Sequence, residues 1–373
     1  MERVETLIVG AGPVGLFLAC ELRRRGRECA IIESATQPST HSKALAIMPG
    51  TLELFEEAGI ADRFLRAANC VDGVRFVTPR RSVYVPFAVT ILPQWRTEAI
   101  LEARLQEFGT QVMRGHTLTH LVGHGDETEA VIQTAGGVRT VRARYLAGCD
   151  GVRSTVREQI GIRFDGETYP GTVLLADTIV QTAVPANEAR VHVHRGGVLT
   201  MFPFSASERR IVVISSREPL PEQAEREPLE CRLRNAGYAD TGVHEILWSN
   251  SFRVHRRIAS RMRAGNVFLA GDSVHTHSPV GGQGMNIGLH DAASLADKLG
   301  AVLGAQAPES LLDRYERERL PVAKGVLRRT DILTRALVHP HPLVRMTRER
   351  VAPRLAALPV IYGPVIRRLS LTA

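Results

Sequence analysis

Residues 4–33, with the sequence VETLIVGAGPVGLFLACELRRRGRECAIIE, decide the fold. The apolar run at residues 7–9 predicts a short buried strand, and the apolar positions over residues 14–25 have helical spacing. Three arginines followed by a glycine then mark the end of a helix. A second apolar run at residues 30–32 completes a strand–helix–strand unit, which is the building block of a parallel sheet.

Three glycines occupy the turn between the first predicted strand and the helix. Gly10, Gly12 and Gly15 have the spacing GxGxxG. In this pattern the first glycine permits a tight turn, the second lets the backbone approach a pyrophosphate, and the third lets the helix pack on the strand. Glu33 ends the second strand, near the offset expected of an acid that binds a ribose and repels a 2′-phosphate. The pattern therefore predicts a site for FAD or NAD rather than NADP.

A second glycine-rich segment lies far along the sequence. Residues 267–272 (VFLAGD) predict a buried strand ending in Asp272, whose carboxylate would face the ligand crevice and accept a bond from a sugar-alcohol hydroxyl. Residues 279–288 (PVGGQGMNIG) then lead into a predicted helix. Its N-terminus would stabilise negative charge by about 0.3–1 kcal/mol. A reduced flavin carries such a charge on its pyrimidine side, so the two segments together predict one FAD site.

In combination, these motifs resemble those of the flavin-dependent aromatic hydroxylases with the para-hydroxybenzoate hydroxylase fold, the group A flavoprotein monooxygenases. The match spans roughly residues 4–325. Besides the GxGxxG with Glu33, it rests on Asp150-Gly151-x-x-Ser154-x-Val156-Arg157, on Gly271-Asp272 with His275 and Gly281 to Gly284, on Asp291-Ala292, and on Tyr315-Glu316-x-Glu318-Arg319-x-Pro321.

The resemblance implies a set of cofactor-binding residues. Asp272 would hold the ribityl chain of FAD, Gln94 would lie near the flavin, and Asp150 and Arg153 would serve cofactor binding and the use of NAD(P)H. Lys43 stands where the family often has an arginine near the pyrophosphate, which keeps the charge but weakens bidentate contact. The full predicted set is Gly10, Gly12, Pro13, Val14, Gly15, Glu33, Lys43, Gln94, Leu118, Asp150, Arg153, Asp272, Pro279, Gly282, Gly284, Met285 and Asn286.

The resemblance also implies an activity, an FAD-dependent monooxygenase that uses NADH or NADPH and O₂ to hydroxylate an aromatic compound through a C4a-hydroperoxyflavin. We assign no catalytic base, because packing or surface roles explain the candidates better. These candidates are Tyr84, His192, His194, Arg195, His275 and His277. Met201, Phe202 and Phe204, together with few charges suited to binding a carboxylate, predict a hydrophobic phenolic or polyketide-like substrate.

Two other functions stay open. One is an FAD-dependent epoxidase or reductase of an isoprenoid-like substrate, and the other is a non-catalytic FAD-binding partner protein. The flavin halogenases share the fold, but their WxWxIP signature is absent, since Trp95 and Trp248 are the only tryptophans.

Composition points to a cytoplasmic protein. The net charge is +8, and the arginines are spread along the sequence, which indicates a solvated basic surface and not a nucleic-acid patch. The five cysteines are scattered without metal-ligand spacing and suggest free thiols. No apolar run reaches the ~18 residues of a membrane span. We therefore expect a monomer or homodimer that binds a small aromatic molecule, with no nucleic acid, metal or integral membrane segment.

The predicted fold class is α/β with an α+β insert. Residues 1–72, 97–171 and 262–325 would form a discontinuous, Rossmann-like FAD-binding domain. Residues 73–96 and 172–261 would form an inserted antiparallel sheet that binds the substrate. Residues 326–373 would add C-terminal helices, and the prolines from Pro321 onward predict breaks between them.

Overall fold

Five parallel strands form the centre of the first sheet in a computed structural model, which describes residues 2–41, 44–78, 81–124, 126–194, 197–215 and 220–338. In spatial order these strands are β16 (Val267–Leu269), β9 (Gly137–Gly148), β1 (Glu2–Val9), β2 (Cys29–Glu33) and β6 (Val112–Arg114). The antiparallel strands β15 (Arg263–Ala264), β7 (Thr117–His124) and β8 (Glu127–Thr134) complete the sheet. The predicted strand–helix–strand unit is confirmed, and β8 and β9 form a hairpin that turns at Gly136 and Gly137.

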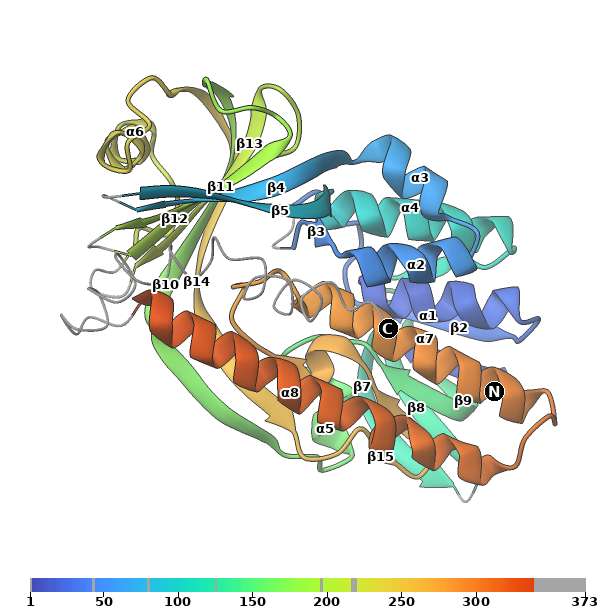
Figure 1. The fold of residues 1–373 in the computed structure, drawn as a ribbon. Helices are drawn as coiled ribbons and strands as arrows, with labels where there is room; N and C mark the ends of the chain where they lie inside the picture. Colours follow the sequence, from blue (N-terminus) through green and yellow to red (C-terminus); the bar gives the residue numbers. More distant parts are fainter. Residues whose placement is uncertain are drawn as a thin grey trace.

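Helices cover this sheet. The helix α1 (Pro13–Arg24) packs against both α7 (Gly284–Leu303) and α4 (Gln94–Glu107). Figure 1 shows α7 lying between α1 and the long helix α8 (Asp313–Val338). The remaining helices near this sheet are α2 (Pro49–Glu57), α3 (Ala61–Ala67), α5 (Thr155–Gln159) and the 3-10 turns η1 (Gly271–Ser273) and η2 (Glu309–Leu312). No helix of the described residues has the length and apolar character needed to cross a membrane.

A second, nine-stranded sheet lies beside the first. Its strands, in spatial order, are β17 (His275–Thr276), β14 (Gly242–Ala259), β10 (Phe164–Gln181), β13 (Glu208–Ser215), β12 (Gly197–Pro203), β11 (Glu188–His194), β4 (Asn69–Thr78), β5 (Arg81–Ile91) and β3 (Ala46–Ile47). All neighbours are antiparallel except β4 and β11. The strands β10 and β14, each 18 residues long, pair with each other and run from this sheet down to the first layer (Figure 1).

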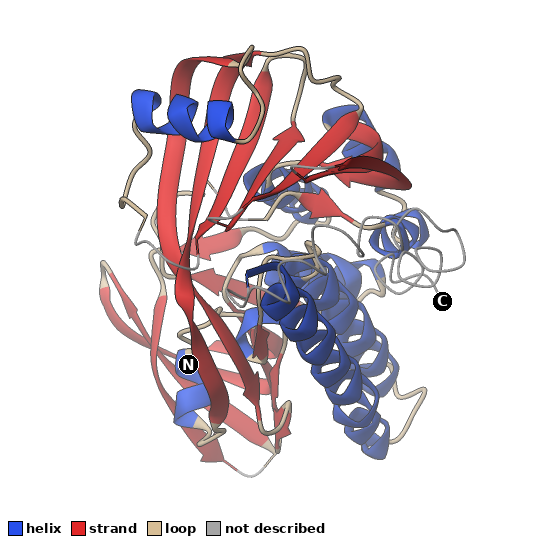
Figure 2. Ribbon diagram, turned by 60° about the vertical axis from the view of Figure 1, so that its left-hand side comes forward, coloured by secondary structure: helices blue, strands red, loops and turns tan. Residues whose placement is uncertain are grey.

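The second sheet has two different faces. Helix α6 (Arg226–Asn235) covers one of them, as Figure 2 shows, and its Leu229 and Leu233 pack there with Leu199, Met201 and Val213. Met201, which the sequence analysis grouped with Phe202 and Phe204, belongs to this cluster. Because side chains of a strand alternate between the faces, Met201 points under α6 while Phe202 points to the other face.

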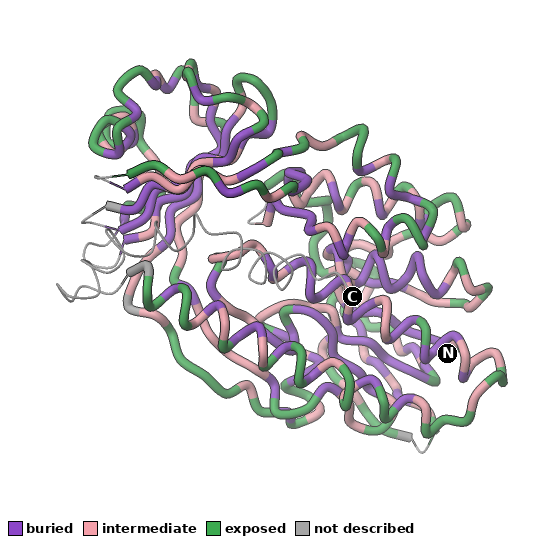
Figure 3. Tube along the Cα trace, in the orientation of Figure 1, coloured by how far each residue is buried: buried purple, intermediate pink, exposed green. Residues whose placement is uncertain are grey.

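The buried interior follows the two sheets and the helix α7, whereas exposed residues follow the outer turns of α8 and α6 (Figure 3). The expected helix break at Pro321 was wrong, since α8 continues through it. Pro321 is exposed, so the carbonyl group that loses its helical partner can face water, and the buried side chains of Tyr315, Ala323 and Val326 keep the helix packed. The later prolines lie outside the described residues. The proposed domain boundaries remain a prediction.

Candidate functional site

The turn between β1 and α1 leaves room for a ligand at one glycine only. Gly10 has a φ of +101°, and a Cβ there would lie 2.5 Å from the Cys149 carbonyl oxygen. A Cβ on Gly15 would lie 2.0 Å from the Gly10 carbonyl oxygen. At Gly12 a Cβ would meet nothing within 4 Å. Gly10 and Gly15 are therefore required by packing, while Gly12 faces open space.

The N-terminus of α1 suits a pyrophosphate. Gly12 is its N-cap and Pro13 its first residue, and in this described turn no side chain caps the helix and no acid is present. The first backbone N–H groups of such a helix lack partners and sit at the positive end of its dipole. These groups can hold an anion without competition from a carboxylate of the chain.

Glu33 is fixed at the end of β2, beside the glycine turn. Its Oε2 accepts a hydrogen bond from the Ala11 N–H at 2.9 Å. Its Oε1 accepts bonds from the Ala35 N–H at 2.9 Å and the Ser34 hydroxyl at 3.0 Å. A carboxylate has about four acceptor positions, so Glu33 can still accept a bond from a ribose hydroxyl.

Val14 brings the two halves of the predicted site together. A Cβ on Gly271 would lie 2.9 Å from the Val14 Cγ2, and one on Gly288 would lie 2.6 Å from the same atom. Only glycines at both positions allow η1 and α7 to pack this closely on α1. The exposed Asp272 of η1 therefore lies near the N-terminus of α1, as the sequence predicted for one FAD site.

The loop before α7 is tied to the strand β3. The fully buried Asn286 donates from Nδ2 to the carbonyl oxygens of Ala46 and Gly282, at 2.9 and 2.8 Å, and its Oδ1 accepts from the Met48 N–H at 2.9 Å. Gly282 has a φ of +62° and packs against Ala46 and Met48. Its N–H donates to the carbonyl oxygen of the exposed Pro279.

The N-terminus of α7 matches that of α1. It begins at Gly284 with no side-chain cap and no acid in its first turn, among residues that the structure describes. Met285 is buried. Two such helix ends on adjacent helices suit the two negatively polarised parts of FAD, the pyrophosphate and the pyrimidine side of the flavin.

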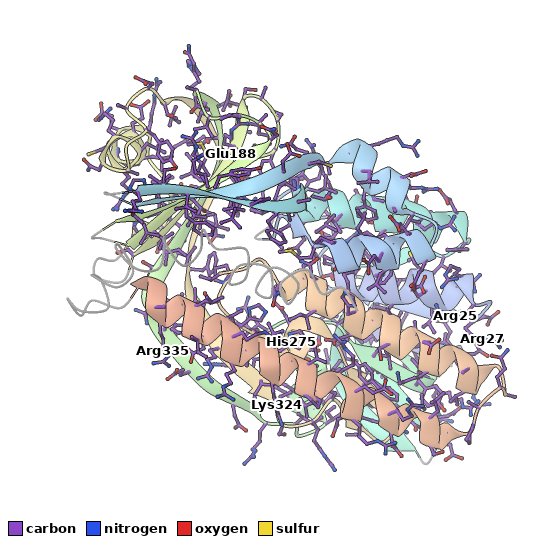
Figure 4. The ribbon with its side chains drawn as sticks, in the orientation of Figure 1. Arg25, Arg27, Glu188, His275, Lys324 and Arg335 are labelled. Atoms are coloured by element: carbon purple, nitrogen blue, oxygen red, sulfur yellow. The ribbon has the colours of Figure 1, made fainter. Side chains whose placement is uncertain are left out.

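A buried charge network supports this half of the site. The fully buried Asp291 of α7 bonds to His275 Nε2 and to Arg319 Nε, each at 2.7 Å, and it accepts from the Gly271 N–H at 3.4 Å. Burial alone would raise the pKa of Asp291, but Arg319 and His275 outweigh it and hold the pKa below its ordinary value. Figure 4 shows His275 between α7 and α8. The sequence motif included these residues, but their role in joining η1, α7 and α8 was missed.

Two histidines of this loop have structural hydrogen bonds. His275 bonds to Asp291, and the His277 Nδ1 donates to the Ser278 carbonyl oxygen at 2.8 Å. Burial lowers the pKa of His277 to about 4, so its ring is neutral at pH 7. His192 is buried under α6 against Tyr238, and Tyr84 is exposed beside Arg75. His194, Arg195 and Lys43 have side chains outside the described part.

Gln94 begins α4 and bonds within the chain. Its Nε2 donates to Glu98 Oε1 at 2.8 Å, and its Oε1 accepts from the Ala44 N–H at 3.4 Å. Burial raises the pKa of Glu98 to about 7, and the Glu33 carboxylate adds to the effect. A direct contact between Gln94 and the flavin remains a prediction.

The Asp150 motif has a clear local role. Asp150 accepts bonds from the Ser154 hydroxyl at 2.5 Å and the Val156 N–H at 3.0 Å, which fixes the start of α5. Arg153 is exposed, and Leu118 is buried in the core. The roles of these three predicted residues toward FAD or NAD(P)H remain predictions.

Residues 3–330 match the protein family described as FAD binding domain. The chain is 36% identical over 348 residues to the uncharacterized aromatic compound monooxygenase YhjG of Bacillus subtilis, covering 90% of this chain and 69% of that protein. It is 35% identical over 365 residues to the 12-dehydrotetracycline 5-monooxygenase/anhydrotetracycline 6-monooxygenase of Streptomyces rimosus, covering 93% and 72%.

Solved structures agree with these matches. The OxyS anhydrotetracycline hydroxylase of Streptomyces rimosus superposes with a TM-score of 0.83 at 33% identity, covering 99% of this chain and 76% of that one. The p-nitrophenol 4-monooxygenase PnpA of Pseudomonas putida, at 23% identity, shares the fold with a TM-score of 0.88 and covers 99% of both chains. With the FAD site assembled from both ends of the sequence, this chain belongs to the FAD-dependent aromatic monooxygenases.

Proposed function

We propose that the protein hydroxylates a hydrophobic phenolic or polyketide-like aromatic compound, with NADH or NADPH as reductant and O₂ as oxidant. One observation carries this choice of substrate, namely the apolar face that the second sheet turns away from α6. The half-buried side chains of Phe202, Trp248 and Phe252 lie on it, together with Val173 and Val212. Such a layer favours flat apolar molecules, since aromatic rings stack and bury large areas there.

This face begins next to the FAD site. Phe204, which follows β12, belongs to a cluster of buried side chains that includes Ala46 and Met48. Asn286 of α7 bonds to the backbone of both these residues. A compound lying on the apolar face would therefore lie beside the loop that leads into α7.

Different elements of the chain would bind different parts of FAD and the substrate. When bound, FAD supplies the redox and oxygen-activating chemistry of this family. The N-terminus of α1 would hold the pyrophosphate, Glu33 the ribose, and the N-terminus of α7 would stabilise negative charge on the flavin. The second sheet would exclude water from the reacting atoms and orient the substrate.

The relatives support an aromatic substrate of this kind. By their names, curated relatives at 34–37% identity act on 6-methylpretetramide, rifampicin and pentachlorophenol. One solved structure at 28% identity, with a TM-score of 0.82, is described as the Diels-Alderase PyrE3. The test of the proposed function therefore follows oxygen transfer directly.

The test uses the purified, FAD-loaded protein. NADH and NADPH oxidation are followed with polycyclic phenols and with small benzoates, and isotopically labelled O₂ is traced into the product by mass spectrometry. We expect polycyclic phenols to stimulate oxidation and to gain one labelled oxygen atom. Stimulation by benzoates alone would refute the substrate class. Turnover of an isoprenoid, or no turnover at all, would favour the epoxidase/reductase or the partner-protein alternative.

A further inference from the structure

The apolar face of the second sheet carries a buried pair of opposite charges. Arg210 of β13 donates from Nε and Nη2 to the two carboxylate oxygens of Asp177 of β10, at 2.6 and 2.7 Å. The Arg210 side chain is fully buried, and that of Asp177 is 11% exposed. The two residues are direct cross-strand partners, so they lie on the same face. Asp177 therefore occupies the forked face of the guanidinium that suits a carboxylate.

On the side of the pair toward Val173 and Ile214, the described residues of this layer are uncharged, whereas Glu208 and Glu245 flank it on the other side. Strand alternation and register place the following described residues of β10, β12, β13 and β14 and the turn after β12 on the same face: Val173, Leu175, Val198, Thr200, Phe202, Phe204, Val212, Ile214, Trp248, Asn250 and Phe252. The Arg210 guanidinium lies over the rings of Phe204 and Trp248, at 5.4 and 5.6 Å from their centres. His41, from the loop after β2, stacks on the Trp248 ring.

The pair also lies close to the FAD side of the site. Arg210 Nη1 donates to the Ala44 carbonyl oxygen at 3.5 Å. The same carbonyl oxygen accepts from the Gln94 N–H at 3.1 Å. Arg210 is thus one backbone carbonyl group away from a residue that we predict to lie near the flavin.

We propose that Asp177 is a specificity-determining residue, which neutralises Arg210 so that the site takes uncharged aromatic compounds and rejects aromatic carboxylates. This inference rests on the proposed function, because it assumes that the substrate lies on the apolar face. An arginine in an apolar layer is a strong carboxylate binder, since its planar fork matches the two oxygens. With Asp177 in that position, an incoming carboxylate loses its hydration, meets a like charge and gains no bidentate partner from Arg210.

The test compares two probes of the same shape. Neutral 1-naphthamide and anionic 1-naphthoate are titrated into the FAD-loaded enzyme at pH 7.5, and binding is measured by calorimetry. We expect the wild-type protein to bind the amide at least about tenfold more tightly, or ~1.4 kcal/mol. In Asp177→Asn we expect the dissociation constant of the naphthoate to fall about tenfold or more, with that of the amide changing less than about threefold.

A matched control lies on the opposite face of the same sheet. Glu188 of β11 also binds an arginine bidentately, with Oε1 2.8 Å from Arg75 Nε and Oε2 2.7 Å from Arg75 Nη2, and its side chain is 8% exposed. Figure 4 places Glu188 in the second sheet, away from His275. Glu188→Gln should leave the ratio of the two dissociation constants unchanged. Adding Arg210→Met to Asp177→Asn should abolish the gain in naphthoate binding.

The outcomes separate this inference from the proposed function. Equal wild-type affinity for both probes, or an unchanged ratio in Asp177→Asn, would overturn it even if the enzyme hydroxylates polycyclic phenols. The wild-type comparison applies even if Asp177→Asn fails to fold. If neither probe binds the FAD-loaded protein, the apolar face is not the substrate site, and the inference falls together with the proposed substrate class.

Discussion

Removing the Asn286 side chain should release the flavin while the protein stays folded. Asn286→Ala deletes all three bonds that join α7 to residues 46–48 and to Gly282. Alanine is the best helix former, so the helix itself should persist. The change therefore acts on the junction between the two halves of the FAD site.

The magnitude follows from the three bonds. The Met48 N–H is left buried without its partner, which costs about 1–3 kcal/mol, and each lost bond to a carbonyl oxygen costs about 0.5–1.5 kcal/mol. The free energy of unfolding of the apoprotein should fall by about 2–6 kcal/mol in total. Because the released loop leads into the α7 N-terminus, the FAD dissociation constant should rise at least about tenfold. Urea unfolding measures the first quantity and flavin fluorescence the second.

A matched asparagine provides the control. Asn69 also donates from its side chain to two carbonyl oxygens, those of Ala186 and Pro203, at 2.7 and 3.1 Å, but Pro203 ends β12 and Ala186 lies in the connection between β10 and β11. Asn69→Ala should lower stability by about 1–3 kcal/mol and change FAD affinity less than about threefold. If both variants weaken FAD binding equally, the loss reflects general destabilisation and our account of the junction is refuted.

Three further changes probe other parts of the site. Gly288→Ala should weaken FAD binding and stability by about 1–3 kcal/mol through its clash with Val14, as measured by fluorescence and urea unfolding. Glu98→Gln should alter the pH profile of urea unfolding. The folded pKa of about 7 lies above the ordinary value of 4.5, so wild-type stability should fall as pH rises from about 4.5 to 7, and the variant should lack this fall. Arg319→Met should lower stability by about 3–5 kcal/mol, because it leaves a buried carboxylate of α7 without its arginine.

Each of these has an internal control. Adding Val14→Ala to Gly288→Ala should restore part of the lost stability, and an additive loss would contradict the packing argument. The Glu98→Gln variant should match the wild type near pH 5, and an equal difference at pH 5 and pH 8 would exclude titration of this group. Arg317→Met, on the exposed side of α8, should stay within about 0.5 kcal/mol of the wild type.

Much of the flavin domain could be predicted because its signals are local. Gly15 is required by a contact within its own turn, with the Gly10 carbonyl oxygen, and the helix predicted after residues 279–288 is α7. The second sheet was harder to predict. The 18-residue strand β14, GVHEILWSNSFRVHRRIA, is mostly half-buried and lacks a clean alternation, so no pattern marked it.

The helix break predicted at Pro321 was wrong because the tertiary structure accommodates this proline within α8. Pro86 likewise lies within an element, the 11-residue strand β5, opposite Gly73 and just past a register shift, where the ladder is irregular. The role of Asp291 could not be predicted either, because its partners His275 and Arg319 come from other elements. A composition count likewise could not show that Arg210 is neutralised, because the pairing depends on strand register.

The bond between Met48 and Asn286 joins positions 238 residues apart, and this separation affects how the protein matures. During synthesis, the strand–helix–strand unit at the beginning emerges early, but the face of α1 that packs on α7 stays uncovered until α7 has been made. The entropy of closing so large a loop must be overcome before the flavin site exists. FAD can then bind tightly only to chains that have completed this closure, and its binding holds them in the native state by mass action. The yellow colour of the protein therefore reports completed folding as well as cofactor content.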